Sequence, residues 1–403
     1  MKTFEIAVIG GGLAGMVAAI ALARGGRNVA LIAPKAEGED RRTTALMDQS
    51  IRFLDRLTLW EKLKPSAAPL ATMRIIDGTS RLLRAPTTTF RAAEVGLEAF
   101  GYNFPNKALM DVLDAAAEAE GNITRFNAFA AAVEVSADIV AITLSDNDML
   151  TSEFVIGADG RKSKLRETIG VDVKQWSYPQ SAMVLNFAHS LPHENISTEF
   201  HTESGPFTQV PLPGNRSSLV WVQNPADAEA RRELSLAELS DVVEERMQSL
   251  LGKVTVEEGL QVWSLSGMMA HRSGMGRAAL IGEAAHVFPP IGAQGLNLSL
   301  RDVMALYDIL CGRPELPLPS DAGNQFDRKR RADIMTRTAS VDVLNRSLLS
   351  DFLPMQVLRA AGLHILSAIP PLRSLVIREG IEPGRGLRDI PAAIRDGLRR
   401  KKA

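Results

Sequence analysis

A glycine-rich turn near the N-terminus limits the fold of this 403-residue chain more than any other feature. An apolar run from Phe4 to Ile9 leads into GGGLAG, which places Gly10, Gly12 and Gly15 in the GxGxxG spacing, and a small-residue helix follows. A second apolar run, NVALIAP, comes next. A strand, glycine turn, helix and strand within about 30 residues is the context in which this pattern binds a dinucleotide. Gly10 would permit the tight turn, Gly12 would let a pyrophosphate approach the backbone, and Gly15 would let the helix pack on the strand.

The start of the predicted helix supplies the second half of this argument. Leu13, Ala14 and Gly15 would offer backbone N–H groups and the positive end of the helix dipole to phosphates. The acidic residue that usually ends the second strand and binds a ribose hydroxyl is replaced here by Ala33. Three carboxylates just beyond it are candidates to substitute: Glu37, Glu39 and Asp40. The turn alone does not name the nucleotide, and a glycine turn without a ligand is the alternative.

Two later segments also place a carboxylate directly after an apolar strand. The stretch FVIGADGRKSKLRE places Asp159 and Gly160 after one such strand, and IGEAAHVFPPIGAQGLNLSLRD places Gly282 and Glu283 after another. A carboxylate at the end of a strand is a suitable acceptor for sugar hydroxyls, and glycines beside it let a bulky ligand lie against the backbone. The sequence therefore predicts three turns that hold one nucleotide-like cofactor.

With these motifs in this order, the chain resembles the flavin-dependent aromatic hydroxylases built like para-hydroxybenzoate hydroxylase. Within them it looks most like the ubiquinone-biosynthesis hydroxylases, the group of UbiH and its relatives. The segment from Asp40 to Leu63 resembles the family's D-x-R segment, in which Arg42 matches the arginine that contacts the flavin. The stretch GPFTQVPLPGNRSSLVW resembles a strand pair of the family's substrate domain, and PPIGAQGLNLSLRD resembles its P-x-x-G-Q-G-x-N signature. This chain departs from the pattern at Glu283, Ala293 and Ser299, where the family usually has Asp, Gly and Gly.

The resemblance implies FAD as the cofactor and an α/β fold, with a Rossmann-like FAD-binding domain, a β-sheet substrate domain and C-terminal helices. The expected FAD-binding domain is discontinuous, over 1–68, 98–172 and 268–320. The substrate domain would take 69–97 and 173–267, and a helical region would follow over 321–403. The residues implied to bind FAD are Gly10, Gly12, Leu13, Ala14, Gly15, Arg42, Asp159, Gly160, Gly282, Glu283, Pro290, Gly292, Ala293, Gln294, Gly295, Leu296 and Asn297.

The resemblance also implies the chemistry, which belongs mainly to the cofactor. NADPH or NADH would reduce the flavin, O2 would add to give a C4a-hydroperoxide, and an electron-rich phenol would take its distal oxygen. The expected substrate is a polyprenylated phenol of ubiquinone biosynthesis. No residue is firmly assigned as catalytic. His286 is a weak acid–base candidate, and support of the loop around it is the preferred interpretation.

Two other functions stay open at this point. One is hydroxylation of a small soluble aromatic compound, which predicts a polar pocket with an arginine that binds a carboxylate. The other is a non-catalytic, flavin-binding component of a ubiquinone-biosynthesis assembly.

The amino-acid composition argues against some classes of partner and bound group. With 46 Lys and Arg against 47 Asp and Glu, the chain lacks the basic excess of a nucleic-acid binder. Its single cysteine, Cys311, excludes an intrachain disulfide and fits a reducing compartment. No metal cluster is expected, because His189, His193 and His201 are interpreted as surface or structural residues.

The C-terminal region is the candidate for contact with a membrane or with other ubiquinone-biosynthesis proteins. The segment from Pro354 to Ile377 is apolar but carries Arg359, His364 and Arg373, and the chain ends in RRKKA. Such a segment can rest on a membrane surface. A helix that covers the core and a solvated basic tail are the alternatives. We see no signal peptide and no apolar run of the ~20 residues that a membrane span needs. The expected location is the cytoplasm, with peripheral contact to the inner membrane as an open alternative.

Overall fold

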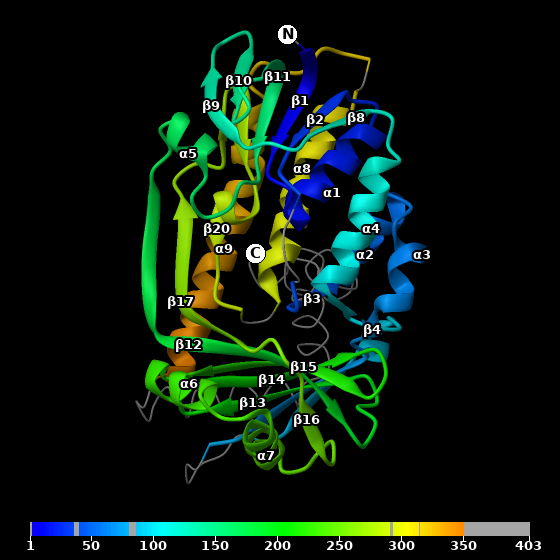
Figure 1. Ribbon diagram of the computed structural model, residues 1–403, viewed down its shortest axis with the longest axis vertical. Coiled ribbons are helices and arrows are strands. Elements are labelled where there is room, and N and C mark those ends of the chain that lie inside the picture. Colours follow the sequence, from blue (N-terminus) through cyan, green and yellow to red (C-terminus); the bar gives the residue numbers. More distant parts are fainter. Residues whose placement is uncertain (1, 36–39, 80–85, 291–292, 314, 350–403) are drawn as a thin grey trace, which may run out of the picture.

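The computed structural model describes residues 2–35, 40–79, 86–290, 293–313 and 315–349. Helices and strands are mixed throughout these residues, which confirms the predicted α/β class (Figure 1). One sheet forms the upper part of the view in Figure 1, a second sheet forms the lower part, and long strands and helices run between them. The predicted domain boundaries stay a prediction.

The first sheet carries the glycine turn. Eight strands of the described chain form it: β1 (Lys2–Ile9), β2 (Val29–Ile32), β8 (Ile123–Phe126), β9 (Ala130–Val135), β10 (Val140–Leu144), β11 (Met149–Gly157), β18 (Gly274–Met275) and β19 (Ala278–Leu280). β1 pairs in parallel with β2 and β11, and β11 pairs in parallel with β19. Both faces of β1 are buried: Ile6 and Val8 belong to one core cluster, and Ala7 and Ile9 belong to another. Burial on both faces explains why this strand reads as a continuous apolar run.

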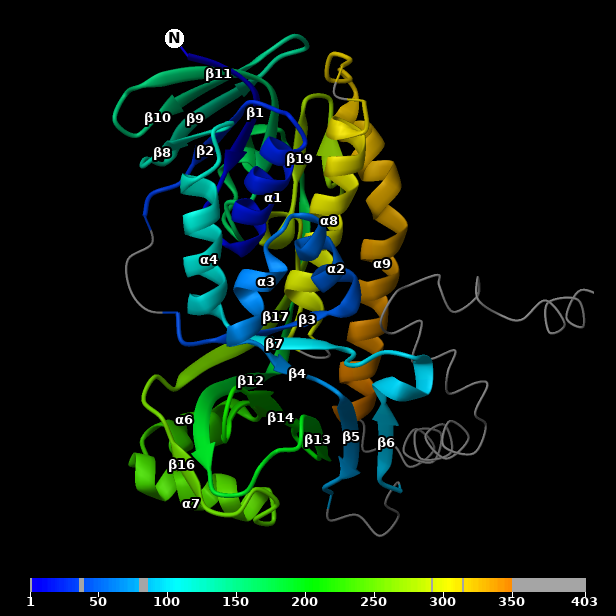
Figure 2. The same ribbon diagram turned by 90° about the vertical axis from the view of Figure 1, so that its right-hand side faces the viewer.

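Helices cover one face of the first sheet. α1 (Leu13–Arg24) is buried from Gly15 to Ala23, which explains its small apolar side chains. It packs against α4 (Asn106–Glu118) and α8 (Gln294–Cys311), as Figure 2 shows. The short helix α5 (Lys164–Thr168) follows β11 and is capped by the hydroxyl of Ser163, which accepts a hydrogen bond from the backbone N–H of Arg166.

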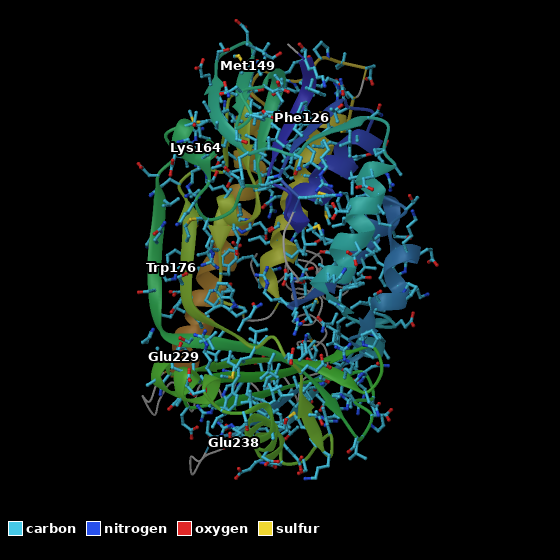
Figure 3. All side chains as sticks on the ribbon, in the orientation of Figure 1. Phe126, Met149, Lys164, Trp176, Glu229 and Glu238 are labelled. Atoms are coloured by element: carbon cyan, nitrogen blue, oxygen red, sulfur yellow. The ribbon has the colours of Figure 1, made fainter. Side chains whose placement is uncertain are left out.

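The second sheet is mostly antiparallel. Its strands in the described chain are β5 (Thr72–Asp77), β6 (Thr88–Arg91), β12 (Val173–His189), β13 (Ile196–Thr202), β14 (Gly205–Leu212), β15 (Arg216–Gln223), β16 (Val254–Val256), β17 (Gln261–Ala270) and β20 (His286–Val287). β12 and β17 are long and run from the second sheet toward the first (Figure 1). α6 (Pro225–Arg232) and α7 (Leu236–Arg246) lie at this end of the molecule. A capping box between Ser235 and Glu238 starts α7, and Figure 3 labels Glu238.

A small third sheet and short helices lie between the two large sheets. It consists, within the described residues, of β3 (Thr43–Met47), β4 (Ala68–Pro69) and β7 (Gly101–Pro105). β3 leads directly into α2 (Asp48–Arg56), which contacts α8, and α3 (Trp60–Leu63) contacts α4. The described residues also contain 3₁₀ turns at Lys64–Ser66, Ala92–Val95 and Gly282–Ala284.

The last described helix, α9 (Ala322–Leu349), connects the two ends of the molecule. It contacts α8, β18 and β19 near the first sheet and β14 in the second. The indole of Trp176 donates a hydrogen bond to the hydroxyl of Tyr178 (2.6 Å), which donates to Asp342 of α9 (2.9 Å); Figure 3 labels Trp176. No helix within the described part is long and apolar enough to cross a membrane. The predicted surface segment from Pro354 to Ile377 lies outside the described residues.

Candidate active site

The three predicted turns meet at the carboxyl ends of neighbouring strands. In the strand register Ile9 pairs with Gly157, and Gly157 pairs with Leu280, so the three turns leave the sheet side by side. A Cβ atom on Gly10 would overlap the carbonyl oxygen of Ala158. Ligands of open parallel sheets bind outside the carboxyl ends of the strands, which is where these turns lie.

The first turn shows which glycines the protein itself requires. Gly10 has φ +115°, and a Cβ atom on Gly15 would overlap the carbonyl oxygen of Gly10. Gly12, by contrast, has extended backbone angles, and a Cβ atom there would meet nothing within 4 Å. α1 has no side-chain cap and no acidic residue in its first turn. Open space in front of an uncapped helix N-terminus suits a diphosphate.

An ion pair joins the second turn to the third. Nε of Arg161 lies 3.3 Å from a carboxylate oxygen of Glu283, and its guanidinium also donates to the hydroxyl of Ser266 (3.2 Å). Both paired side chains are about half exposed, so the pair adds little stability but leaves the carboxylate accessible. Arg166 also connects these two turns, because its buried guanidinium donates to the carbonyl oxygens of Ala284 (2.9 Å) and Arg161 (2.7 Å).

In the described structure, only one of the two carboxylate oxygens of Asp159 has hydrogen-bond partners. One carboxylate oxygen accepts the backbone N–H of Lys164 (2.7 Å) and, at longer range, that of Leu165 (3.3 Å) at the start of α5. The other oxygen, Oδ1, is buried without a hydrogen-bond partner in the described structure. Buried polar atoms are normally paired, so Oδ1 is an acceptor that a ligand hydroxyl can satisfy. Gly160, at φ +80°, turns the chain immediately afterwards.

Three carboxylates were considered as replacements for the missing acidic residue at Ala33, and the structure describes one of them, Asp40. Asp40 accepts hydrogen bonds from Arg42 (2.8 Å) and from the side-chain amide of Asn106 (3.0 Å). Burial raises the pKa of Asp40, but these hydrogen bonds outweigh it and hold the pKa at about 2. The carboxylate is therefore charged and already paired. Glu37 and Glu39 lie outside the described residues.

The loop before α8 carries a strained residue. Ala293 is the N-cap of α8 and has φ 53° and ψ 35°, the left-handed region that non-glycine residues adopt uncommonly. Gly292 lies outside the described residues. Gln294 begins the helix, and its side-chain oxygen accepts a hydrogen bond from Arg337 of α9 (3.1 Å). The helix has no side-chain cap and no acidic residue in its first turn, so its N-terminus keeps its positive end toward the loop.

Asn297 has its whole hydrogen-bonding capacity in use. Its amide nitrogen donates to the carbonyl oxygens of Ala45 (2.8 Å) and Ala293 (2.7 Å). Its oxygen accepts from the backbone N–H of Met47 (2.8 Å) and from the hydroxyl of Ser50 (2.7 Å). An asparagine side chain has two donors and two acceptor sites, so none is left for a ligand. Asn297 therefore ties the loop before α8 to the junction of β3 and α2.

His286 lies in a buried charged network. Its Nε2 is 2.7 Å from Asp302 Oδ2, and its ring stacks on Phe288. Asp302 also accepts Nε of Arg330 from α9 (2.8 Å) and the backbone N–H of Gly282 (3.3 Å). Both His286 and Asp302 are almost fully buried. This geometry agrees with the preferred interpretation that His286 supports the loop.

A cavity of about 500 Å³ lies between the loop before α8 and the second sheet. One wall consists of Phe288, Pro289, Pro290, Ala293, Gln294, Gly295 and Leu296, and a second wall includes Arg42, Thr43, Thr44, Ala45, Met47, Asn103 and Asn106. The facing wall consists of Leu70, Met73, Arg74, Ile75, Phe90, Ser197, Glu199, Thr208, Val210, Ser218 and Val220. A smaller cavity of about 320 Å³, beside Trp221 and Arg231, has none of the predicted site residues in its lining.

Apart from Asn297, the predicted residues that the structure describes thus fall into two groups. Those at positions 10–15, 159–160 and 282–283 form the three turns, while Arg42, Pro290 and positions 293–296 line the cavity. Arg161 and Arg166 were not among the predicted site residues, although both lie in the basic stretch that closely follows the Asp-Gly pair. Glu199 and Thr208 were not predicted either, because their proximity depends on strand pairing, for which the sequence carries no signal.

The chain is similar to a known protein family, to known sequences and to solved structures. The family model described as FAD binding domain matches residues 3–312. The chain is 31% identical to ubiquinone hydroxylase UbiL of Rhodospirillum rubrum, with 97% of this chain and 94% of that protein covered. It is 29% identical to 3-demethoxyubiquinol 3-hydroxylase of Escherichia coli, covering 89% of this chain and 93% of that protein. The crystal structure of p-nitrophenol 4-monooxygenase PnpA from Pseudomonas putida has a TM-score of 0.77 at 18% identity, over 96% of this chain and 99% of that chain, and supports the fold.

Proposed function

We propose that this protein hydroxylates the ring of a polyprenylated phenol in ubiquinone biosynthesis. The proposal starts from its family: the chain belongs to the FAD binding domain family and, within it, to the ubiquinone hydroxylases. It is therefore an FAD-dependent aromatic monooxygenase. NADPH or NADH and O2 would be its co-substrates. The observation that carries the substrate proposal is the cavity of about 500 Å³, whose wall is apolar along Leu70, Ile75 and Phe90 and polar around Glu199 and Thr208. A phenol that bears an isoprenoid chain has both characters.

The three turns fit FAD. Gly10, Gly12 and Gly15, with Leu13 and Ala14, would face the diphosphate, since the space at Gly12 is open and the N-terminus of α1 is uncapped. The unpartnered Oδ1 of Asp159, beside Gly160, and the accessible carboxylate of Glu283, beside Gly282, are acceptors that suit the hydroxyls of FAD. When bound, FAD supplies the acceptance of electrons from the nicotinamide donor and the activation of O2.

The loop before α8 would lie beside the flavin ring. We assign Arg42, Pro290, Gly292 and the residues from Ala293 to Leu296 to contact with the cofactor. The positive end of α8 favours negative charge next to it. Asn297 is better described as a positioning residue, because its amide is fully used in holding Ala45 and Met47.

The cavity walls would perform the remaining tasks. Phe288, Pro289 and Leu296 on one side and Val210 and Val220 on the other present apolar groups that exclude water from the reacting atoms. The same walls would hold the ring in one orientation, which is the main contribution of a protein to cofactor-borne chemistry.

The test uses the full-length protein loaded with FAD. NADPH or NADH is added with a phenol that bears a short isoprenoid chain, and both nicotinamide oxidation and product mass are followed. We expect substrate-stimulated oxidation and a product heavier by one oxygen. Flavin-loaded protein that oxidises neither donor with any such phenol would contradict the proposal and favour a non-catalytic flavin-binding component.

One observation favours a second candidate, a small aromatic acid as substrate. Arg74 is among the residues that line the cavity, and within the described chain it makes no hydrogen bond or ion pair. A guanidinium is a suitable partner for a carboxylate. The two candidates are separated by comparing turnover of a prenylated phenol with that of a hydroxybenzoate in the native protein and in Arg74→Gln. A loss confined to the hydroxybenzoate would support the second candidate.

A further inference from the structure

Among the described residues that line the cavity, Glu199 alone carries a carboxylate. It lies on β13, where the residues alternate between the two faces of the sheet. Phe200, its neighbour, is buried in the apolar core on the far face, together with Phe207. Glu199 belongs to the opposite set, with Ser197 and His201. A charged residue on a strand that faces a partly apolar cavity needs an explanation, because burying a carboxylate costs free energy.

The strand register shows that Glu199 points into the cavity. It pairs with Thr208 on β14 and with Ile75 on β5, and Thr208 in turn pairs with Val220 on β15. Directly paired residues project to the same face of a sheet. All three of these neighbours line the cavity, so the carboxylate belongs to the same wall. About a quarter of its side-chain surface (27%) remains exposed.

Two side chains hold this carboxylate in place. Nε2 of His201 lies 2.8 Å from Oε1 of Glu199, and the hydroxyl of Thr208 donates to Oε2 at 3.3 Å. His201 is buried. An ionised carboxylate has about four acceptor sites, so two partners leave capacity for a third hydrogen bond. Thr208 and His201 are positioning residues, and the remaining acceptor sites are available to a molecule in the cavity.

We propose that Glu199 is the catalytic base that accepts the phenolic proton of the substrate; this rests on the proposed function. The phenolic O–H bond breaks, the proton passes to the carboxylate of Glu199, and the electron pair stays on the phenolic oxygen. The ring becomes more electron-rich and therefore a better acceptor of the oxygen atom. No oxidant or reductant takes part in this step. General-base catalysis of this kind typically contributes about 10²- to 10⁴-fold in rate.

A purely structural role is the competing explanation, in which Glu199 only pairs with the buried His201. The variant Glu199→Gln separates the two, because glutamine keeps the length of the side chain and a hydrogen-bond acceptor but cannot take a proton. The matched control is Glu257→Gln, which breaks the ion pair with Arg216 (2.7 Å) at the edge of the same sheet, outside the cavity.

The experiment compares two substrates in FAD-loaded, full-length protein: a short-chain prenylated phenol, and its ring-fluorinated analogue assayed above the pKa of its hydroxyl. The fluorinated compound arrives as the phenolate and does not need a base. We expect Glu199→Gln to lower kcat for the ordinary phenol about 100-fold or more and to lower it far less for the fluorinated one. Glu257→Gln should leave both rates unchanged.

Each outcome decides something. Equal losses with both phenols, or no loss with either, would overturn the role of Glu199 as a base. A native enzyme that turns over neither phenol would instead refute the proposed function and this inference with it. If Glu199→Gln does not bind FAD or does not fold, Glu199→Asp replaces it. Aspartate keeps a carboxylate that can accept the proton, but its shorter side chain holds that carboxylate farther back. The variant should show the same dependence of kcat on phenol acidity, with a smaller loss of kcat.

Discussion

Replacement of Asp302 by asparagine tests the connection between α9 and the third turn. Asp302 is fully buried and joins three elements: His286 of β20, Gly282 of the third turn and Arg330 of α9. Burial by itself raises the pKa of Asp302, but the charges and hydrogen bonds of His286 and Arg330 outweigh it and lower the pKa. The carboxylate is therefore charged at neutral pH, and asparagine keeps its shape while removing the charge.

The expected decrease in the free energy of unfolding depends on which ion-pair partners remain in the Asp302 variant. Removing one member of a buried ion pair typically costs about 3–5 kcal/mol. Arg330 keeps a second partner, Asp333 at 2.6 Å, so we expect the low end, about 3 kcal/mol in the free energy of unfolding. The matched control is Asp308→Asn. Asp308 also bridges α8 and α9, pairing with Lys329 at 2.7 Å, but both side chains are about half exposed or more. Its loss should cost less than about 1 kcal/mol.

The assay is urea denaturation followed by far-ultraviolet circular dichroism at neutral and acidic pH. The folded pKa of Asp302 lies below its ordinary value of 3.8. The contribution of Asp302 to the free energy of unfolding is therefore fully present above that ordinary value, and it is lost as the pH falls through the folded pKa. The native protein and Asp302→Asn should differ most at neutral pH and converge in acid. Equal costs for the Asp302 and Asp308 variants at neutral pH would refute the reasoning.

Four further predictions concern single residues. Ala293→Gly should raise the free energy of unfolding by about 1 kcal/mol, because it relieves a left-handed backbone; a lower denaturation midpoint would contradict this. Gly12→Ala should leave the unfolding of the flavin-free protein unchanged, since the added Cβ meets nothing, yet weaken FAD binding about tenfold or more, measured by flavin fluorescence titration. Gly10→Ala should instead destabilise the flavin-free protein itself, because the added Cβ overlaps Ala158. Burial raises the pKa of Cys311 to about 11, so native protein at pH 8 should resist thiol alkylation and urea-unfolded protein should react; fast labelling of the native chain would argue against that burial.

Local patterns were enough to predict the positions of the three turns. The spacing of Gly10, Gly12 and Gly15 after an apolar strand is a local signal, and the structure has β1, a turn and α1 at these positions. Asp159 and Glu283 could be singled out in the same way, because each follows the end of a buried strand. The α/β class follows from the alternation of such units.

Features that depend on distant pairing could not be predicted. The ion pair between Arg161 and Glu283 joins residues far apart in the chain, and neither side chain reveals its partner. The saturation of the Asn297 amide depends on carbonyl and N–H groups at the junction of β3 and α2. Glu199 faces the cavity only because β13 pairs with β14 and β5 in one particular register.

The length of α9 has a mechanical consequence for access to the cavity. Its 28 residues span about 42 Å at the usual rise of 1.5 Å per residue. It contacts strands of the first sheet near one end and β14 of the second sheet farther along. A continuous helix that contacts both sheets resists stretching and bending, so the two sheets cannot hinge apart unless α9 bends or releases one of them. We therefore expect a substrate to enter past the rim of the cavity, with the spacing of the sheets unchanged between the empty and the occupied protein.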